Sequence, residues 1–268
     1  QFGDDSALKE SGDDDRYFRY LIDRSFVAKG IGTVLTGSVR AGSIKTGSSL
    51  KHTASGELTK LRSARLDKTE LNEVYNGQRA AMNVSLDHKL VNRGDWLIDA
   101  KLFHPINLLD ATVDFINPDF KLQSSAQYHV HIGASHHVVN IRHLGESLYQ
   151  VKCLEQMIAH HGDRFIVRDP ASQHTLGGGR VVDIFIPRRK RSSESRLAQL
   201  NAMQHDGINA LKQLLKMQVD GIKLQEFSVC RNISKSAIEK LLETLKQEDI
   251  GFHSLNLEKS SLPVLLHE

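Results

Sequence analysis

The stretch RYLIDRSFVAKGIGTVLTGSV, residues 19–39, decides the fold class of this chain. Its three glycines suggest a phosphate-binding loop, but such a loop must follow a strand and open a helix. Here Gly30-Ile31-Gly32 is followed by Thr33-Val34-Leu35-Thr36, whose β-branched residues disfavour the start of a helix. The glycines therefore predict a tight turn or bulge between two strands.

Outward from this stretch, short segments rich in β-forming residues alternate with Gly, Asn and Asp. They predict two consecutive β domains, joined near His104 and Pro105. The first set is Tyr17–Ile22, Thr33–Val39, Ser48–His52, Leu58–Ala64, Ala80–Val84 and Trp96–Ala100. The second set is Ala111–Ile116, Ala126–Ile132, Val138–Leu144, Ser147–Cys153, Arg164–Asp169 and Gly179–Ile186. In the second domain, Gly177-Gly178-Gly179 predicts another turn or bulge.

Strand patterning ends at Pro187–Arg191, and helical patterning follows. A capping box of Ser236 and Glu239 predicts the start of the last helix. The other features are the helical spacing of Leu211, Leu214 and Leu215, a shorter helix over Leu224–Cys230, and a hairpin over residues 251–266. Helices followed by a hairpin predict a winged helix, whose orientation the sequence leaves open.

The predicted fold class is therefore mainly β followed by α. It comprises a flexible lead-in over residues 1–15, a first β-barrel over 16–104, a second over 105–187, and a linker with a winged-helix module over 188–268.

Composition excludes some classes of protein. The chain has 268 residues, of which 40% are hydrophobic, and a formal net charge of +3, so any nucleic-acid surface must be a local patch. It has no apolar run long enough for a membrane span, and its acidic start is unlike a signal peptide, which predicts a cytoplasmic protein. Cys153 and Cys230 lie in different predicted domains and are expected to be two reduced thiols.

Two groups of residues leave alternatives open. His129 and His131 share one face of a strand, and His136 and His137 follow, but no carboxylate or thiol stands at a matching spacing, so no metal site is predicted. The basic run Arg188–Arg191 suits either a phosphate backbone or a solvated hinge. No catalytic arrangement is recognisable.

Three motifs carry a resemblance to a known family. The segments IDRSFVAKGIGTVLTGSVRAGSIKTGSSL, NGQRAAMNV and NRGDWL resemble, in order, the β-barrel domain II of translational GTPases. HVHIGASHHVVNIRHL and RDPASQHTLGGGRVVDI resemble domain III of the selenocysteine-specific elongation factors, the SelB family. The helical end is similar to the first winged-helix module of that family.

The resemblance implies a factor that carries selenocysteinyl-tRNA to the ribosome. It also implies that GTP and Mg²⁺ are cofactors of the full-length factor only, because this sequence has no P-loop and no cofactor is expected in this chain. The family recognises a selenocysteine-insertion hairpin in messenger RNA through further winged helices, which are missing here.

By the same resemblance, Asp23, Arg24 and Arg79 line the selenocysteine pocket. A selenol is an anion at neutral pH, so it can pair with arginines, whereas serine would leave their charges unpaired. Asp23 would hold the arginines and accept a hydrogen bond from the α-amino group. The alternative is a surface salt bridge at the rim of a barrel.

The resemblance further implies that the second barrel contacts the tRNA backbone. Candidate phosphate-binding residues in or beside the matching motifs are Arg142, His143, Arg168, His174 and Arg180. Alternatively some are structural, for instance Arg168 paired with Asp169 or Asp183.

Two other hypotheses come from the residues alone. One is a stand-alone nucleic-acid-binding regulator built from β-barrels and a winged helix, which an upstream start codon near Gln1 would favour. The other is a metalloenzyme that uses the histidine cluster, which would require stoichiometric bound metal.

Overall fold

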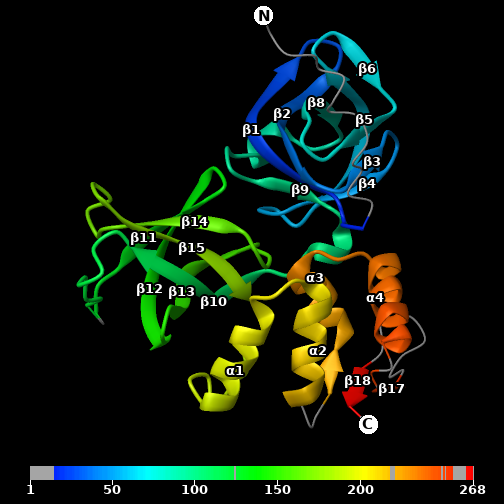
Figure 1. Ribbon diagram of the computed structural model, residues 1–268. Coiled ribbons are helices and arrows are strands. Elements are labelled where there is room, and N and C mark those ends of the chain that lie inside the picture. Colours follow the sequence, from blue (N-terminus) through cyan, green and yellow to red (C-terminus); the bar gives the residue numbers. More distant parts are fainter. Residues whose placement is uncertain are drawn as a thin grey trace, which may run out of the picture. The chain divides into compact units, whose positions relative to one another are not determined.

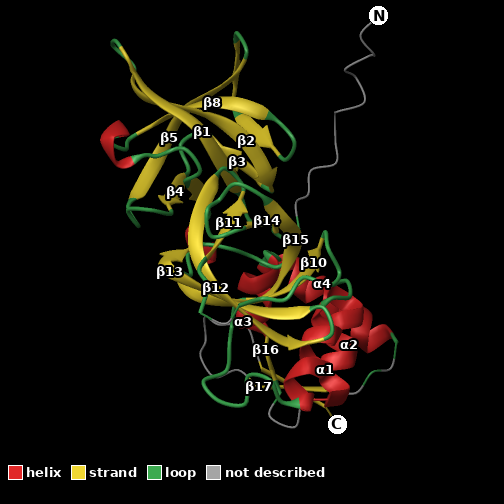
Figure 2. Ribbon diagram, turned by 90° about the vertical axis from the view of Figure 1, so that its left-hand side faces the viewer, coloured by secondary structure: helices red, strands yellow, loops and turns green. Residues whose placement is uncertain are grey.

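The computed structural model describes residues 15–123, 125–217, 221–248, 250, 252–255 and 264–267. The chain divides into two compact units, residues 1–101 and 102–268. The expected order, mainly β and then α, is confirmed: two closed β-barrels precede the helices (Figures 1 and 2).

The first unit contains a closed antiparallel barrel in the order β4-β9-β1-β2-β8-β5, with β4 pairing back to β5. β6 extends the sheet beyond β5, and β3 and β7 pair with each other. The strands are β1 (Arg19–Ala28), β2 (Gly32–Ala41), β3 (Ser43–Lys45), β4 (Ser49–His52), β5 (Leu58–Leu66), β6 (Thr69–Leu71), β7 (Glu73–Tyr75), β8 (Arg79–Val84) and β9 (Trp96–Ile98). Two 3₁₀ helices, His88–Leu90 and Ala100–Leu102, flank β9.

The turn predicted at the glycines connects β1 to β2. Gly30 and Gly32 have φ of 77° and 97°, a left-handed region that glycine adopts without strain. The strand after them alternates, with Leu35 and Val39 buried in the barrel core. The phosphate-loop interpretation is thereby excluded for this stretch.

The second unit begins with another closed antiparallel barrel, in the order β10-β13-β12-β11-β14-β15. Its strands are β10 (Ile106–Phe115), β11 (Tyr128–Ile132), β12 (Ser135–Gly145), β13 (Leu148–Met157), β14 (Arg164–Arg168) and β15 (Thr175–Asp183). β15 begins and ends earlier than the predicted strand Gly179–Ile186.

Gly177–Gly179 do not form a turn, because they lie inside β15, but the register between β14 and β15 shifts next to them, between Thr175 and Gly177. A β-carbon at Gly177 would lie 2.4 Å from the carbonyl oxygen of Asp114. At Gly179 it would lie 2.3 Å from that of Thr112 and 2.5 Å from the ring of Phe165. These glycines therefore allow close packing within the barrel rather than a change of chain direction.

The helical part of the second unit has the element order of a winged helix, preceded by one extra helix. Its elements are α1 (Glu194–Met203), α2 (Gly207–Met217), β16 (Ile222–Lys223), α3 (Leu224–Arg231), α4 (Lys235–Gln247), β17 (Phe252–Leu255) and β18 (Val264–His267). The small sheet has the order β16-β18-β17. The rest of the predicted hairpin over residues 251–266 lies outside the described residues.

The predicted capping box is wrong by two residues. Ser234, not Ser236, is the N-cap of α4, and its Oγ accepts a hydrogen bond from the backbone N–H of Ala237 at 3.2 Å. The helix begins earlier because Asn232 takes a left-handed conformation after α3, and the chain then re-enters a helix at Lys235.

Within the second unit, the barrel and the helices share one hydrophobic core. Helix α1 packs its Leu197 within 3.1 Å of the position a β-carbon would take at Gly145 in the β12–β13 turn. Beneath α1, the buried guanidinium of Arg196 lies 2.7 Å from Asp110 and 2.8 Å from Asp183, and Gln150 donates to Asp110 at 3.1 Å. This network attaches the first helix to strands β10, β13 and β15.

Cys153 and Cys230 are both free and buried, as expected. Burial raises the pKa of the Cys153 thiol to about 12. In the part of the chain that the structure describes, none of the helices has the length and apolar character needed to cross a membrane.

Candidate functional site

The candidate site of the first unit depends on a bulge in β1. Ile22 pairs with Gly37 and Arg24 pairs with Thr36, so Asp23 is an extra residue opposite the continuous strand β2. A bulge twists the strand locally and re-aims the side chain at the extra position. Asp23 is therefore placed by backbone geometry rather than by the regular alternation of a strand.

The bulge brings Asp23 to Arg79, the first residue of β8. The Nη1 atom of Arg79 lies 2.5 Å from Oδ2 of Asp23. The Asp23 side chain is 25% exposed and that of Arg79 is 63% exposed, so the pair lies at the barrel surface with the cation facing solvent. Oδ2 of Asp23 is itself buried, so Arg79 is the charged group that stabilises this carboxylate oxygen.

A buried tyrosine holds the three strands of this site together. The hydroxyl oxygen of Tyr20 lies 3.1 Å from the carbonyl oxygen of Leu35 in β2 and 2.8 Å from that of Ala80 in β8. Burial raises the pKa of Tyr20 far above its ordinary value, Asp23 raises it further, and Arg79 lowers it. Tyr20 is therefore a neutral hydrogen-bond donor beneath the ion pair.

Gly37 gives the bulge its space. A β-carbon there would lie 2.0 Å from the carbonyl oxygen of Leu21 and 2.9 Å from the ring of Tyr20. Sequence reasoning missed both Tyr20 and Gly37 as parts of the site. The signal for them is weak, since a tyrosine and a glycine in adjacent strands are ordinary features of a β domain.

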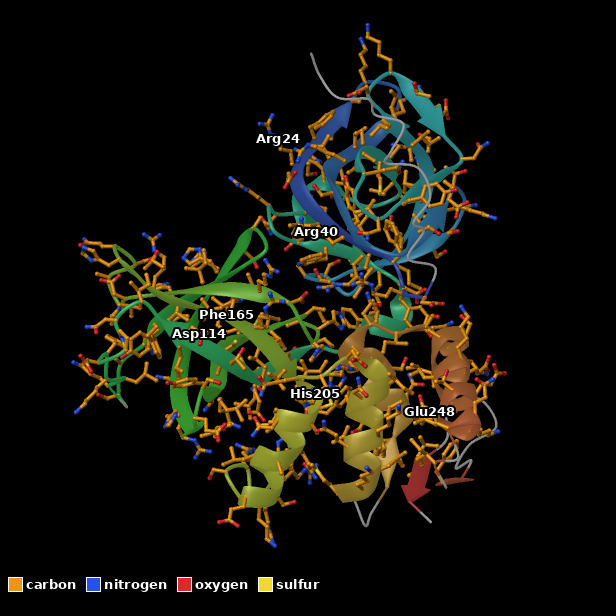
Figure 3. All side chains as sticks on the ribbon, viewed as in Figure 1. Arg24, Arg40, Asp114, Phe165, His205 and Glu248 are labelled. Atoms are coloured by element: carbon orange, nitrogen blue, oxygen red, sulfur yellow. The ribbon has the colours of Figure 1, made fainter. Side chains whose placement is uncertain are left out.

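Arg24 is not part of this ion pair. It is exposed on β1, and Figure 3 shows its side chain projecting outward from the strand. The structure thus brings together two of the three predicted pocket residues, Asp23 and Arg79. The site offers one cation that faces solvent, beside a carboxylate that is mostly buried, and this arrangement suits a ligand that carries a negative group.

The predicted phosphate-binding residues of the second barrel lie in separate places. Arg142 and His143 are exposed on β12, where the imidazole of His143 donates to the carbonyl of Glu146 at 2.7 Å. Arg180 is exposed on β15 and pairs in register with Arg164 of β14. These residues do not converge on one point.

Arg168 is the last residue of β14, and His174 lies in the loop between β14 and β15. Arg168 donates to the carbonyl oxygen of Gln173 at 3.0 Å, and the His174 side chain is 79% exposed. The backbone N–H of His174, above all, lowers the pKa of the Asp169 carboxyl. The suggested pairing of Arg168 with Asp169 or Asp183 is wrong, because Asp169 accepts from loop backbone and Asp183 pairs with Arg196.

His129, His131 and His136 lie on the outside of the second barrel, whereas His137 is partly buried and is opposite the buried Val130. His129 and His131 share one face of β11, as predicted, and the ring of His136 on β12 lies 6.0 Å and 5.8 Å from theirs. Among the described residues, no three His, Cys, Asp or Glu side chains are arranged to hold a metal ion. Burial lowers the pKa of His131 and of His137, and neighbouring cationic groups lower it further.

The chain contains two six-stranded barrels, followed by elements in the order of a winged helix. Comparison with known proteins shows which proteins share this architecture. Residues 110–188 match the protein family described as "Selenocysteine-specific elongation factor, beta-barrel domain".

Two curated relatives are similar in sequence to most of this chain. A selenocysteine-specific elongation factor of Escherichia coli is 27% identical over 241 residues, 89% of this chain and 39% of the relative. One of Haemophilus influenzae is 28% identical over 200 residues, 71% of this chain and 32% of the relative. The chain thus spans well under two thirds of the length of these relatives.

The fold matches that of a solved structure of a bacterial selenocysteine-specific elongation factor with a TM-score of 0.74, at 24% identity over 97% of this chain and 41% of that one. The apo factor from Methanococcus maripaludis matches with a TM-score of 0.56, at 22% identity over 65% of this chain and 43% of that one. Over most of its length the chain is thus similar to selenocysteine-specific elongation factors, and residues 110–188 match their β-barrel domain.

Proposed function

We propose that this chain supplies the aminoacyl-tRNA-binding part of a selenocysteine-specific elongation factor. In this proposal, Asp23 and Arg79 form one side of a pocket for the selenocysteinyl group, and Arg24 lies at its rim. The observation that carries the proposal is the Asp23–Arg79 pair, in which a mostly buried carboxylate holds a guanidinium that faces solvent.

The chemistry of discrimination follows from the charge of the ligand. A selenolate can pair with Arg79, and the α-amino group of the aminoacyl ester can donate to Asp23. Serine has the same amine but a neutral hydroxyl, so it offers nothing to the cation. A charged hydrogen bond contributes roughly 1.5–3 kcal/mol, which corresponds to about 10- to 100-fold in affinity.

Other members of the assembly are part of the same proposal. GTP and Mg²⁺ act in the complete factor and outside residues 1–268, since this sequence contains no P-loop motif. The ribosome and the cytoplasm are the expected partner and location. The messenger hairpin is assigned to further winged helices rather than to this chain. The named relatives favour this function over a stand-alone regulator.

The test measures how well the complete factor distinguishes selenocysteinyl-tRNA from seryl-tRNA. Arg79→Ala is expected to reduce the ratio of the two affinities by about tenfold or more, mainly through weaker binding of selenocysteinyl-tRNA. The matched control is Arg40→Ala, because Arg40 is an exposed arginine on the neighbouring strand β2 (Figure 3). An unchanged ratio in Arg79→Ala would rule out the pocket.

A further inference from the structure

A second cluster of polar side chains lies in the first barrel, at the turn between β4 and β5. Strands β5 and β9 both pair with β4 (Figure 1), and the turn residue Thr53 donates its backbone N–H to the carbonyl of Trp96 in β9. His52 is the last residue of β4, Ser55 lies in the turn, and Asp95 directly precedes β9. The spacing of the three residues does not reveal the cluster, because Asp95 is 43 positions from His52.

The three side chains are connected by hydrogen bonds in a row. The Nδ1 atom of His52 lies 2.9 Å from Oγ of Ser55, and its Nε2 atom lies 3.1 Å from Oδ2 of Asp95. The backbone N–H of Ser55 also donates to Nδ1, at 3.3 Å. A backbone N–H can only donate, so Nδ1 is an acceptor and the imidazole proton is on Nε2, which donates it to Asp95. The hydroxyl of Ser55 therefore donates its proton to His52.

The imidazole and the carboxylate are held in place, whereas Ser55 is accessible. His52 is buried, and the Asp95 side chain is 16% exposed and also accepts from the backbone N–H of Asn92 at 2.7 Å. Ser55 is exposed, and its Oγ accepts from the backbone N–H of Glu57 at 3.3 Å. This donor occupies a lone pair of the oxygen, so the hydroxyl proton stays directed at His52. The cluster thus has a nucleophile, a base and a carboxylate that orients the base.

We propose that Ser55 is an activated hydroxyl that accepts an acyl group from small activated carboxylic esters, with His52 as its base. Oγ of Ser55 bonds to the carbonyl carbon of the ester, and the bond between that carbon and the leaving oxygen breaks. The hydroxyl proton passes to Nδ1 of His52 and then to the leaving oxygen. The carboxylate of Asp95 stabilises the imidazolium between these two transfers. The product is an ester of Ser55.

The alternative is that the cluster only fastens the β4–β5 turn to the loop before β9. Thr53 has such a role, because its Oγ1 accepts from the backbone N–H of Trp96 at 2.9 Å. A purely structural network stabilises the fold, but it does not make Ser55 more reactive than another exposed serine. The reactivity of Ser55 therefore separates the two roles.

The experiment treats the chain with p-nitrophenyl acetate and locates acetyl groups by peptide mass spectrometry over time. Acetylation of Ser55 is expected to be about 100-fold or more faster than that of Ser85, because a positioned general base contributes roughly 10²–10⁴ in rate. Ser85 is the matched comparison within the same unit. It is an exposed serine whose Oγ accepts from Nε of Arg62 instead of donating to an imidazole.

Two variants identify the groups responsible. Ser55→Ala is expected to remove the fast release of p-nitrophenolate, whereas the control Ser85→Ala keeps it. Asp95→Asn is expected to slow acetylation of Ser55 by about tenfold, because a neutral amide stabilises the imidazolium less than a carboxylate does. Urea unfolding of each variant shows whether it is folded, and the comparison of Ser55 with Ser85 in the unchanged chain needs no variant.

Acetylation of Ser55 no faster than that of Ser85 would overturn the proposal. An unchanged rate in folded Asp95→Asn would overturn it as well, because the carboxylate would then have no part in the reaction. The experiment contains no tRNA and does not involve Asp23 or Arg79, so its failure is distinguishable from failure of the selenocysteine pocket.

Discussion

The position of the Asp23 side chain is set by a bulge in the backbone of β1 and not by the alternation of residues along the strand. The bulge between Ile22 and Arg24 adds one residue to β1, and the side chain of that residue then reaches Arg79. The bulge needs Gly37 opposite, where a β-carbon would collide with the carbonyl of Leu21. The ion pair, the bulge and the glycine are thus one structural feature.

At the residue scale, Tyr20→Phe is expected to lower the free energy of unfolding of the first unit by about 1–2 kcal/mol. The substitution removes a buried hydroxyl and leaves the carbonyls of Leu35 and Ala80 without their donor. The measurement is urea unfolding followed by the fluorescence of Trp96, the only tryptophan, which lies in this unit.

The control for Tyr20 is Tyr75→Phe. Tyr75 is 41% exposed, and its hydroxyl donates to the carboxylate of Glu73 at the barrel surface. Its loss is expected to change stability by less than about 0.5 kcal/mol. Equal effects of the two substitutions would show that the Tyr20 hydroxyl does not hold β1, β2 and β8 together.

At the scale of elements, the structure identifies Ser234 and not Ser236 as the N-cap of α4. The two serines have different expected contributions to stability. Ser234→Ala is expected to destabilise the helical module by about 1 kcal/mol, because its Oγ satisfies the N–H of Ala237. Ser236→Ala is expected to change stability by less than about 0.5 kcal/mol. Far-UV circular dichroism during urea unfolding measures both, and a larger effect of Ser236→Ala would contradict the assignment of the cap.

The sequence predicts elements well where local patterning determines them. Alternation of apolar and polar residues predicts the long strands of both barrels, and the glycines before Thr33 predict the β1–β2 turn. The three-residue strands β3, β6 and β7 were missed because each is too short to show a period, whereas β9, equally short, was predicted from its apolar run Trp96–Ile98. The extra helix α1 was also missed.

The candidate site is less predictable, because its contacts join residues far apart in the chain. Asp23 and Arg79 were found only through the resemblance to a family. Arg196 pairs with Asp110, 86 positions away, and nothing local marks either residue as buried. Burial raises the pKa of Asp110, although the nearby guanidinium of Arg196 lowers it. This burial comes from tertiary packing, which the periodicity of the sequence does not reveal.

At the scale of the second unit, a further network joins the barrel to the winged helix. The Nδ1 of His161 donates to the carbonyl of Val182 at 2.9 Å, and its Nε2 accepts from Arg231 at 3.2 Å. Arg231 is buried and also donates to the carbonyls of Met203 and His205 at the end of α1. The neutral form of His161 is therefore required for the contact with α3.

This requirement makes the stability of the second unit dependent on pH. Burial, and then the cation of Arg231, lower the pKa of His161 to about 4, while the carbonyl of Val182 and the carboxylates of Asp183 and Asp163 oppose the shift. Between about pH 6.5 and pH 4 the unfolded chain binds a proton at His161 that the folded chain does not. Stability is therefore full above pH 6.5 and falls as the pH decreases.

The prediction is a loss of about 2 kcal/mol in the free energy of unfolding between pH 7.5 and pH 5.0 from His161 alone. In His161→Gln, whose amide has a donor and an acceptor but no titrating proton, this part of the pH dependence should vanish. Urea unfolding at both pH values, followed by circular dichroism of the helices, isolates it, because His131 and His137 titrate equally in both proteins. Equal pH dependence in the two proteins would contradict the prediction. It would mean that His161 binds its proton equally well in the folded and unfolded chain, so that the contact with Arg231 does not require the neutral imidazole.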